Sequence, residues 1–258
     1  MQSLIKKGGT GKTTTTVNLG AALSKLGKKV LLIDLDSQAS LSYYFGLKDF
    51  QYSVADMLWD QVPLTRTIQI VEDLSVIPAN LDLTDVEVSL YKLPDRLHRL
   101  ETALASVSDF DYVLLDCPPA LSNITANALI AARRVIIPVQ LEVLSLHGLT
   151  LMLQTIGKIA AYVQAPIDVL GLLFNNVSQH FDVYREIRDL IHQNFEVRIF
   201  NTQINHCEKI IESPSFAQSV ICYSPDARGA KSFLNLAREL VLITTDDRFQ
   251  HITQTKTY

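Results

Sequence analysis

Five short runs of continuous apolar residues, alternating with longer amphipathic stretches, constrain the fold of this chain more than any other feature of its sequence. The runs are Val30–Asp34, Leu74–Pro78, Tyr112–Asp116, Val135–Val139 and Val169–Phe174. A strand that is apolar throughout is typical of a parallel sheet covered on both faces. The alternation of strands with helical stretches therefore predicts an α/β fold, built on a single doubly wound, mostly parallel sheet with helices on both faces.

The stretches between these runs have the periodicity of helices. In Thr13–Leu26 the apolar residues fall on roughly one face, and Gly27 follows as a C-cap. The same pattern predicts further helices over Asp85–Val107, Asn123–Ala132, Leu144–Tyr162, Val183–Phe195 and Arg228–Ile243. We expect one domain over residues 1–243, followed by a polar tail, residues 244–258, that lacks periodicity and frays.

The composition excludes several classes of protein. The chain has 258 residues, of which 48% are apolar and 19% charged, so it is neither a disordered protein nor a disulfide scaffold. It has no run of about 18 apolar residues and no signal peptide core. Its three cysteines, Cys117, Cys207 and Cys222, form no zinc or disulfide pattern, which suits a reducing cytosol. The net charge of −4 gives no general sign of a nucleic-acid-binding protein.

The strongest chemical signal is a glycine-rich loop, Lys7-Gly8-Gly9-Thr10-Gly11-Lys12-Thr13-Thr14, placed directly before the first expected helix. Its glycines allow backbone conformations closed to other residues, so that successive N–H groups can face phosphate oxygens. The helix that begins near Lys12 adds the positive end of its dipole. Lys12 can bridge the β- and γ-phosphates, and the Thr13 hydroxyl can bind Mg²⁺. The alternative is a glycine-rich surface turn without a ligand.

A second lysine in the loop, Lys7, makes this pattern more specific. The form Lys-Gly-Gly-x-Gly-Lys-Thr resembles the deviant Walker A box of the ParA/MinD family of P-loop ATPases, in particular the ParA/Soj-type partitioning ATPases. The resemblance implies that ATP and Mg²⁺ are bound, and that Lys7 reaches across a dimer interface to stabilise charge on the transferring phosphoryl group of the partner subunit's nucleotide. It places these residues at the nucleotide: Lys7, Gly8, Gly9, Gly11, Lys12, Thr13 and Thr14.

Carboxylates follow two of the expected strands. The segment Asp34-Leu-Asp36-Ser37-Gln resembles the family's Asp-x-Asp-Pro-Gln box, with Ser37 in place of proline. This resemblance implies that Asp36 orients or activates the attacking water and helps to bind Mg²⁺, while Asp34 supports the metal's surroundings. The alternative is that both residues cap the following turn. Asp116 ends a segment that resembles the Walker B box, which implies a role in the outer shell of Mg²⁺.

The assignments from this resemblance fall into two groups. The expected catalytic residues are Lys7, Lys12 and Asp36. The expected metal ligands are Thr13, Asp36 and Asp116.

The carboxy-terminal third departs further from the family pattern. Family members usually have Pro-Arg-Asn after the last strand, and the Pro and Asn contact adenine. Alignment through Ser213–Ser215 places Asn205, His206 and Cys207 there, so the resemblance assigns the base contacts to Asn205 and Cys207 although neither residue matches. His206 replaces an arginine that DNA-binding members use. Cations remain nearby, either for weak non-specific DNA contacts or as solvated helix faces: Arg185, Arg188, Lys209, Arg228, Lys231 and Arg238.

Three further positions have open interpretations. Asn127 lies in the segment that follows the family's switch II. Glu142 follows the strand ending in Val139, and it either bonds to the loop or a partner subunit or lies on the surface. The first strand has only Met1–Ile5 available, so a hypothesis is that the native start lies upstream of Met1.

The resemblance implies an ATPase of the ParA type. Such a protein is a monomer with ADP or without nucleotide, and a sandwich homodimer with ATP. Hydrolysis is expected to be slow and stimulated by an adaptor with a ParB-like role, which is bound to a plasmid, a chromosome region or another cargo. We expect a cytoplasmic protein, associated with the nucleoid if it binds DNA, and no membrane partner, because the tail has no basic amphipathic helix.

A second function class remains open from the sequence. It is a nucleotide-dependent regulatory or assembly factor, for a secretion or polysaccharide system, that does not bind DNA. The isoelectric point near 5.9 and His206 favour it.

Overall fold

The computed structural model describes residues 9–105, 107–120, 122–140, 146–177 and 181–245. Several expectations fall outside these ranges and are not addressed by the structure. They concern the first strand over Met1–Ile5, the loop residues Lys7 and Gly8, Glu142, and the tail beyond Thr245.

The described strands form two paired groups. Four pair in the order β2-β3-β1-β4 and three in the order β5-β6-β7. All ladders are parallel except the β2–β3 hairpin. The strands are β1 (Val30–Asp34), β2 (Gln69–Val71), β3 (Leu74–Ile77), β4 (Tyr112–Asp116), β5 (Arg134–Val139), β6 (Asp168–Val177) and β7 (Ile204–Asn205). Each predicted apolar run falls on one of these strands, and the mostly parallel α/β fold is confirmed.

Helices connect the strands. They are α1 (Lys12–Lys25), α2 (Ser40–Tyr44), α3 (Val54–Trp59), α4 (Leu64–Thr67), α5 (Asp82–Leu90), α6 (Arg99–Leu104), α7 (Asn123–Ala132), α8 (Leu146–Tyr162), α9 (Phe181–Asn194), α10 (Glu208–Glu212), α11 (Val220–Tyr223) and α12 (Arg228–Thr245), with a 3₁₀ helix η1 (Ser213–Phe216). The prediction of one helix over Asp85–Val107 is wrong, because α5 and α6 are separate. Pro94 lies between them, and proline disfavours the helical conformation of the residue before it.

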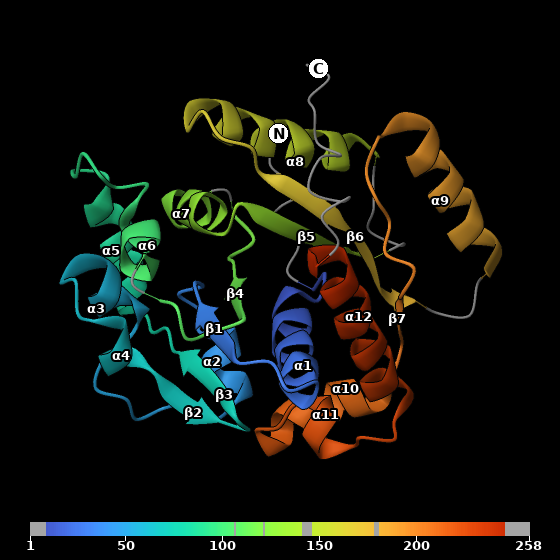
Figure 1. Cartoon of the computed structure of the whole chain (residues 1–258), viewed down its shortest axis with the longest axis horizontal. Coiled ribbons are helices and arrows are strands. Elements are labelled where there is room, and N and C mark those ends of the chain that lie inside the picture. Colours follow the sequence, from blue (N-terminus) through green and yellow to red (C-terminus); the bar gives the residue numbers. More distant parts are fainter. Residues whose placement is uncertain (1–8, 106, 121, 141–145, 178–180, 246–258) are drawn as a thin grey trace.

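Strand β1 shows why its sequence is apolar throughout. Val30 and Leu32 pack into a core with α1, α11 and α12, whereas Leu31 and Ile33 pack into a core with α3, α5, α6 and α7. Successive side chains of a strand point to opposite faces, so a strand covered on both faces has no exposed side. Figure 1 shows the two groups of helices on opposite sides of this strand. A third core joins β5 and β6 to α8.

Helix α1 is more deeply enclosed than its sequence predicts. It lies beside α12 (Figure 1), and most of its second and third turns is buried, instead of one face only. At Gly20 an added Cβ would come within 2.7 Å of the Leu32 side chain, so glycine permits close packing of the helix on β1. Gly27 follows the helix with φ of 78°, which confirms the expected C-terminal signal.

Within the described ranges, no helix combines the length and the apolar character that a membrane crossing requires.

Candidate functional site

The described part of the glycine-rich loop ends in an open helix N-terminus. Gly9 and Gly11 have φ of 108° and 83°, values that favour glycine. Gly11 is the N-cap of α1 and provides no side-chain cap, and the first turn has no acidic residue. The first N–H groups of a helix have no partner within the helix, and they form a favourable site for an anion. The loop can therefore receive phosphate, as its sequence predicts.

Two carboxylates stand opposite each other beside this loop. Asp34 ends β1 and Asp116 ends β4, and the two residues are paired in the parallel register of these strands. Both are buried, with exposed fractions of 0% and 1%. The sheet thus delivers two carboxylates to its carboxyl edge, where ligands bind in open α/β folds.

Asp116 is the carboxylate that the described residues leave without a close hydrogen bond. Neither of its carboxylate oxygens has a hydrogen-bond partner among the described residues. Burial raises the pKa of Asp116 to about 7, against the opposing effects of the Thr13 hydroxyl and the Lys12 ammonium group. A buried carboxylate next to a hydroxyl and an ammonium group, with its oxygens unsatisfied, fits a ligand that brings positive charge.

Asp34 has its own partners. Its Oδ2 accepts hydrogen bonds from the backbone N–H and the hydroxyl of Ser42, at 2.9 and 2.8 Å, and its Oδ1 accepts one from the Asp36 N–H at 3.1 Å. Burial raises the pKa of Asp34, and the bonds from Ser42 oppose that rise. These contacts correspond to the alternative in which Asp34 caps the following turn.

Asp36 lies in the turn between β1 and α2. It is half-buried, and its Oδ1 accepts a hydrogen bond from the Gln38 N–H at 3.0 Å. Its charge contributes to the raised pKa of Asp116, as does that of Asp34, while Lys12 acts in the opposite direction. The structure therefore brings together four residues that the sequence singles out, namely Lys12, Thr13, Asp36 and Asp116.

Cys117 follows Asp116 and packs at the edge of the core that contains α3 and α7. Burial raises the pKa of its thiol to about 12, and the neighbouring Asp116 adds to this effect. A thiol that stays protonated is a poor nucleophile, which agrees with the prediction of a packing role.

Two amide side chains that contact the loop were not assigned a role from the sequence. Asn175 of β6 donates from Nδ2 to the Thr10 carbonyl at 3.2 Å and to the Thr15 hydroxyl at 2.9 Å. Gln140, directly after β5, donates from Nε2 to the Gly9 carbonyl. The available signal was their position, because each is a polar residue at the carboxyl end of an apolar strand.

The expected base-contact residues lie farther along the same edge. Asn205 ends β7 and is paired with Val177, two residues beyond Asn175 on β6. Cys207 is the N-cap residue of α10. Between them, His206 Nδ1 is 2.9 Å from Asn176 Oδ1. The assignment of adenine contacts to Asn205 and Cys207 stays a prediction.

Asn127 forms hydrogen bonds only with backbone groups among the described residues. It is buried, accepts from the Leu100 N–H at 3.2 Å, and donates to the carbonyls of Arg96 and Asn123 at 2.7 and 2.9 Å. It therefore fastens α7 to the start of α6.

Some of the cations expected near the carboxy terminus have local partners. Lys209 Nζ is 2.7 Å from Glu212 Oε2, and Arg238 donates to Asn235 at 2.9 Å. Both side chains are exposed, so these contacts leave the two cations accessible to solvent.

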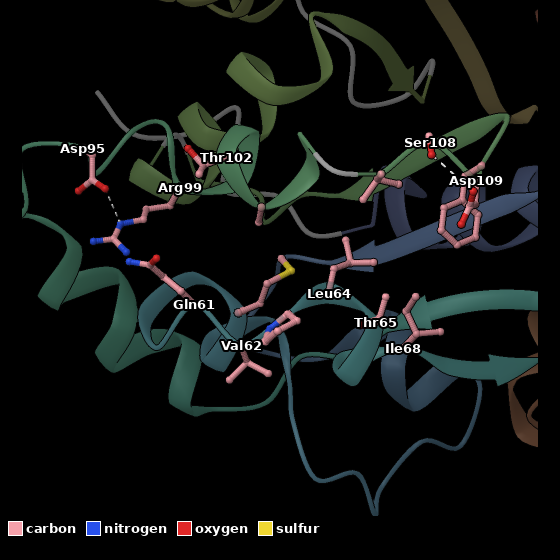
Figure 2. Close-up of a pocket in the computed structure, with 15 residues that line it drawn as sticks. Gln61, Val62, Leu64, Thr65, Ile68, Asp95, Arg99, Thr102, Ser108 and Asp109 are labelled. Carbon is pink, nitrogen blue, oxygen red and sulfur yellow. Dashed lines mark hydrogen bonds and ion pairs between the residues drawn. The ribbon is translucent and has the colours of Figure 1, made fainter.

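A cavity of about 460 Å³ lies away from the loop, between the α3–α4 segment and α6. Figure 2 shows Arg99 and Asp95 joined at one end, with Leu64 and Ile68 along the floor and Asp109 at the other end. The Arg99 Nε to Asp95 Oδ2 distance is 3.0 Å. None of the residues that the sequence assigns to the nucleotide lines this cavity.

Comparisons with known proteins show which proteins this chain is similar to. A family model described as an AAA domain matches residues 3–169. The chain is 36% identical to the sporulation initiation inhibitor protein Soj of Bacillus subtilis, over 91% of this chain and 95% of that protein. It is 37% identical to the chromosome-partitioning ATPase Soj of Treponema pallidum, over 92% of this chain and 94% of that protein.

A solved structure extends the likeness to three dimensions. Cobyrinic acid a,c-diamide synthase from Mycobacterium smegmatis, with bound ATP analogue and magnesium, is similar with a TM-score of 0.82 and 29% identity. The match covers 93% of this chain and 92% of that chain.

Proposed function

The chain belongs to the ParA/MinD-type family of P-loop ATPases, and we propose that it is an ATP-hydrolysing switch of the ParA type. Its reaction is ATP + H₂O → ADP + phosphate. ATP binding joins two protomers face to face, and hydrolysis, slow until an adaptor stimulates it, separates them. The two nucleotide states differ in affinity for adaptor and cargo, and this difference drives positioning of the cargo.

The observation that carries this proposal is the unpartnered carboxylate of Asp116 beside Thr13 and Lys12. The open N-terminus of α1 receives the phosphates, and Lys12 neutralises their charge. Asp36, half-buried in the turn after β1, holds and orients the attacking water. These roles need a nucleotide between the loop and the two strand ends.

The residues present fit Mg²⁺. Among the described residues, no group of three or more His, Cys, Asp or Glu side chains is arranged to hold a metal ion alone. Magnesium bound with a nucleotide usually takes one or two protein oxygens and completes its shell with phosphate and water. Thr13 would supply such an oxygen directly, while Asp36 and Asp116 would act beside it, Asp116 through a bound water in the outer shell. When bound, Mg²⁺ neutralises charge that develops on the β- and γ-phosphates.

The proposed dimer gives a role to Lys7, which lies outside the described residues. A cation donated across the interface to the partner's nucleotide makes hydrolysis depend on dimerisation. Lys7 and Lys12 would thus act on different nucleotides, although they are five residues apart in the sequence.

The experiment that tests the proposal is size-exclusion chromatography with light scattering on Asp36→Ala, with and without ATP–Mg²⁺. Loss of the water-orienting carboxylate should preserve ATP binding and prevent turnover, so the mass should double from 28.8 kDa only when ATP–Mg²⁺ is present. Lys12→Ala should bind no ATP, whereas Lys7→Ala should bind ATP and stay monomeric. A monomeric Asp36→Ala protein that calorimetry finds saturated with ATP would contradict the sandwich dimer.

DNA binding decides between the ParA-type function and the regulatory factor without a DNA role. The acidic chain and His206 favour the second, and the family assignment favours the first. Retention on DNA that requires ATP and weakens steeply with salt would support the ParA-type function. Absence of retention at a salt concentration of about 50 mM would support the regulatory factor.

A further inference from the structure

Two neighbouring strands deliver side-chain amides to the same side of the phosphate loop. Strands β5 and β6 are parallel, and Val139 is paired with Phe174. The next residue after Val139 is Gln140, and the next residue after Phe174 is Asn175. Gln140 donates to the Gly9 carbonyl, and Asn175 donates to the Thr10 carbonyl and the Thr15 hydroxyl. The Gly11 carbonyl also lies 3.5 Å from Asn175 Nδ2, at the outer limit of a hydrogen bond.

The orientation of the Asn175 amide follows from its partners. Backbone carbonyls can only accept, so the amino group and not the amide oxygen must face the loop. This orientation is unfavourable for the amide oxygen, because Asn175 Oδ1 is buried without a hydrogen-bond partner among the described residues. Asn175 itself is 5% exposed. An amide held in this way, with an unsatisfied acceptor, indicates a requirement for a donor at this point and not merely for a residue that fills space.

We infer that Gln140 and Asn175 are positioning residues, which hold the loop carbonyls toward the sheet so that the loop N–H groups face the nucleotide. The inference rests on the proposed nucleotide-binding function. In a trans peptide, the C=O of one residue and the N–H of the next point in opposite directions. Carbonyls of Gly9 and Thr10 that bind amides of the sheet therefore direct the N–H groups of Thr10 and Gly11 away from it. These are the groups that a phosphate cradle needs.

Gly11 shows how closely Asn175 approaches the loop. A Cβ at Gly11 would lie 2.6 Å from Asn175 Nδ2, whereas a Cβ at Gly9 would meet nothing within 4 Å. Both glycines have positive φ, so both are strained by substitution. Only Gly11, however, is also restricted by contact with the proposed positioning residue.

The direct test replaces each donor by an acceptor of equal size. Asn175→Asp and Gln140→Glu put a carboxylate oxygen against the loop carbonyls, which should repel it and turn the N–H groups away. We expect the dissociation constant for a non-hydrolysable ATP analogue with Mg²⁺ to rise about 10- to 100-fold. The control is Asn176→Asp, which adds the same charge one residue farther along β6, on an exposed side chain that bonds to His206.

Binding is measured by calorimetry on the full chain, with thermal unfolding to verify the fold. If Asn175→Asp does not fold, Gln140→Glu carries the test, because Gln140 is only partly buried. Folded variants of Asn175 and Gln140 that bind within twofold of the parent would overturn the inference. A parent protein that binds no nucleotide would instead contradict the proposed function, so the two failures are distinguishable.

A kinetic measurement separates positioning from general loss of structure. Loop N–H groups contact the phosphates before and during hydrolysis, so Asn175→Asp should raise KM more than it lowers kcat.

A double variant tests the contact between Asn175 and Gly11. Asn175→Ala should relieve part of the binding loss of Gly11→Ala, since it removes the atom that the new Cβ would meet. Strictly additive losses in the double variant would contradict the contact.

Discussion

Asp34 and Asp116 stand opposite each other at the ends of neighbouring strands and are equally buried, but they differ in what satisfies their charge. Asp34 accepts three hydrogen bonds, all from residues 36 and 42 just after its own strand. Asp116 accepts none from the described residues. The sequence gives both the same context, an apolar strand that ends in aspartate.

The difference separates a structural carboxylate from a candidate binding carboxylate. Burying a charge without partners is unfavourable, so a fold that needed only stability would have no reason to keep Asp116. A nucleotide and its metal would supply the partners that the described residues do not give it. Asp34 instead connects β1 to α2 and orders the turn that carries Asp36.

Removal of Asp34 should have the largest effect on stability. Asp34→Ala leaves the N–H groups of Ser42 and Asp36 without their acceptor, and the Ser42 donor is buried. We expect a loss of about 3–5 kcal/mol in the free energy of unfolding, measured by urea denaturation. Asp49→Ala, at an exposed carboxylate, is the control and should change stability by less than about 0.5 kcal/mol. A loss at Asp34 as small as that of the control would mean that Asp34 has no structural role.

The second prediction concerns the response to ligand. A ligand at 100 to 1,000 times its dissociation constant stabilises a protein by roughly 3–4 kcal/mol. Asp116→Asn removes the charge that interacts with Mg²⁺, so it should lose most of the additional stabilisation that Mg²⁺ gives in the presence of ATP. Thermal unfolding with ATP, with magnesium or with a chelator, measures this. If Asp116→Asn kept the full magnesium response, Asp116 would have no part in the metal site.

Without nucleotide, the same substitution should stabilise the protein. The pKa of Asp116 is raised to about 7 in the folded state, above its ordinary value of 3.8, so the folded state holds its proton more tightly than the unfolded state. Stability contributed by this group therefore falls as pH rises from about 4 to about 7, and levels off above. Asp116→Asn should remove that fall, with a gain of about 2–4 kcal/mol at pH 8.

The measurement is urea denaturation of both proteins at pH 5 and pH 8, with the nucleotide removed. The gain should be clearly smaller at pH 5 than at pH 8, because at pH 5 only the first part of the fall between about pH 4 and about pH 7 has taken place. A gain of equal size at both pH values would mean that the charge of Asp116 is not its cause.

The periodic parts of the fold were predictable from the sequence. A strand such as β1 or β4, apolar at every position, has few alternatives, and its predicted limits agree with the structure. The short helices α2, α3 and α4 were missed, because four to six residues are too few to show a helical period. The break between α5 and α6 was missed because the apolar pattern continues on both sides of Pro94.

The candidate site was predictable only where its residues are close in sequence or follow a known spacing. The loop and the two strand-end aspartates have such spacing. The sequence could not separate Asp34 from Asp116, since the difference arises from Ser42, which turns back to one carboxylate and not to the other. Asn175 contacts the loop from more than 160 residues away, and only the strand order brings them together.

Substitution of Ser42 should change the free energy of unfolding least. It removes one hydrogen bond from Asp34, which then resembles the less satisfied Asp116. The Ser42 hydroxyl donates to Asp34 and accepts from the Ala79 N–H at 2.9 Å, so Ser42→Ala removes one partner of the carboxylate and leaves a buried N–H unsatisfied. We expect a loss of about 1–2 kcal/mol, because the backbone N–H of residue 42 still donates. Ser40→Ala, on the exposed side of the same helix, is the matched control.

The pH dependence of this loss tests its cause. The Ser42 hydroxyl lowers the pKa of Asp34, against the rise that burial produces. Without it, the folded-state pKa rises further above the ordinary value, so the variant should lose more stability as pH rises. Urea denaturation of Ser42→Ala and Ser40→Ala should therefore differ more at pH 8 than at pH 5. An equal difference at both pH values would assign the loss to the Ala79 contact alone, and Asp34 would then not depend on Ser42 for its charge.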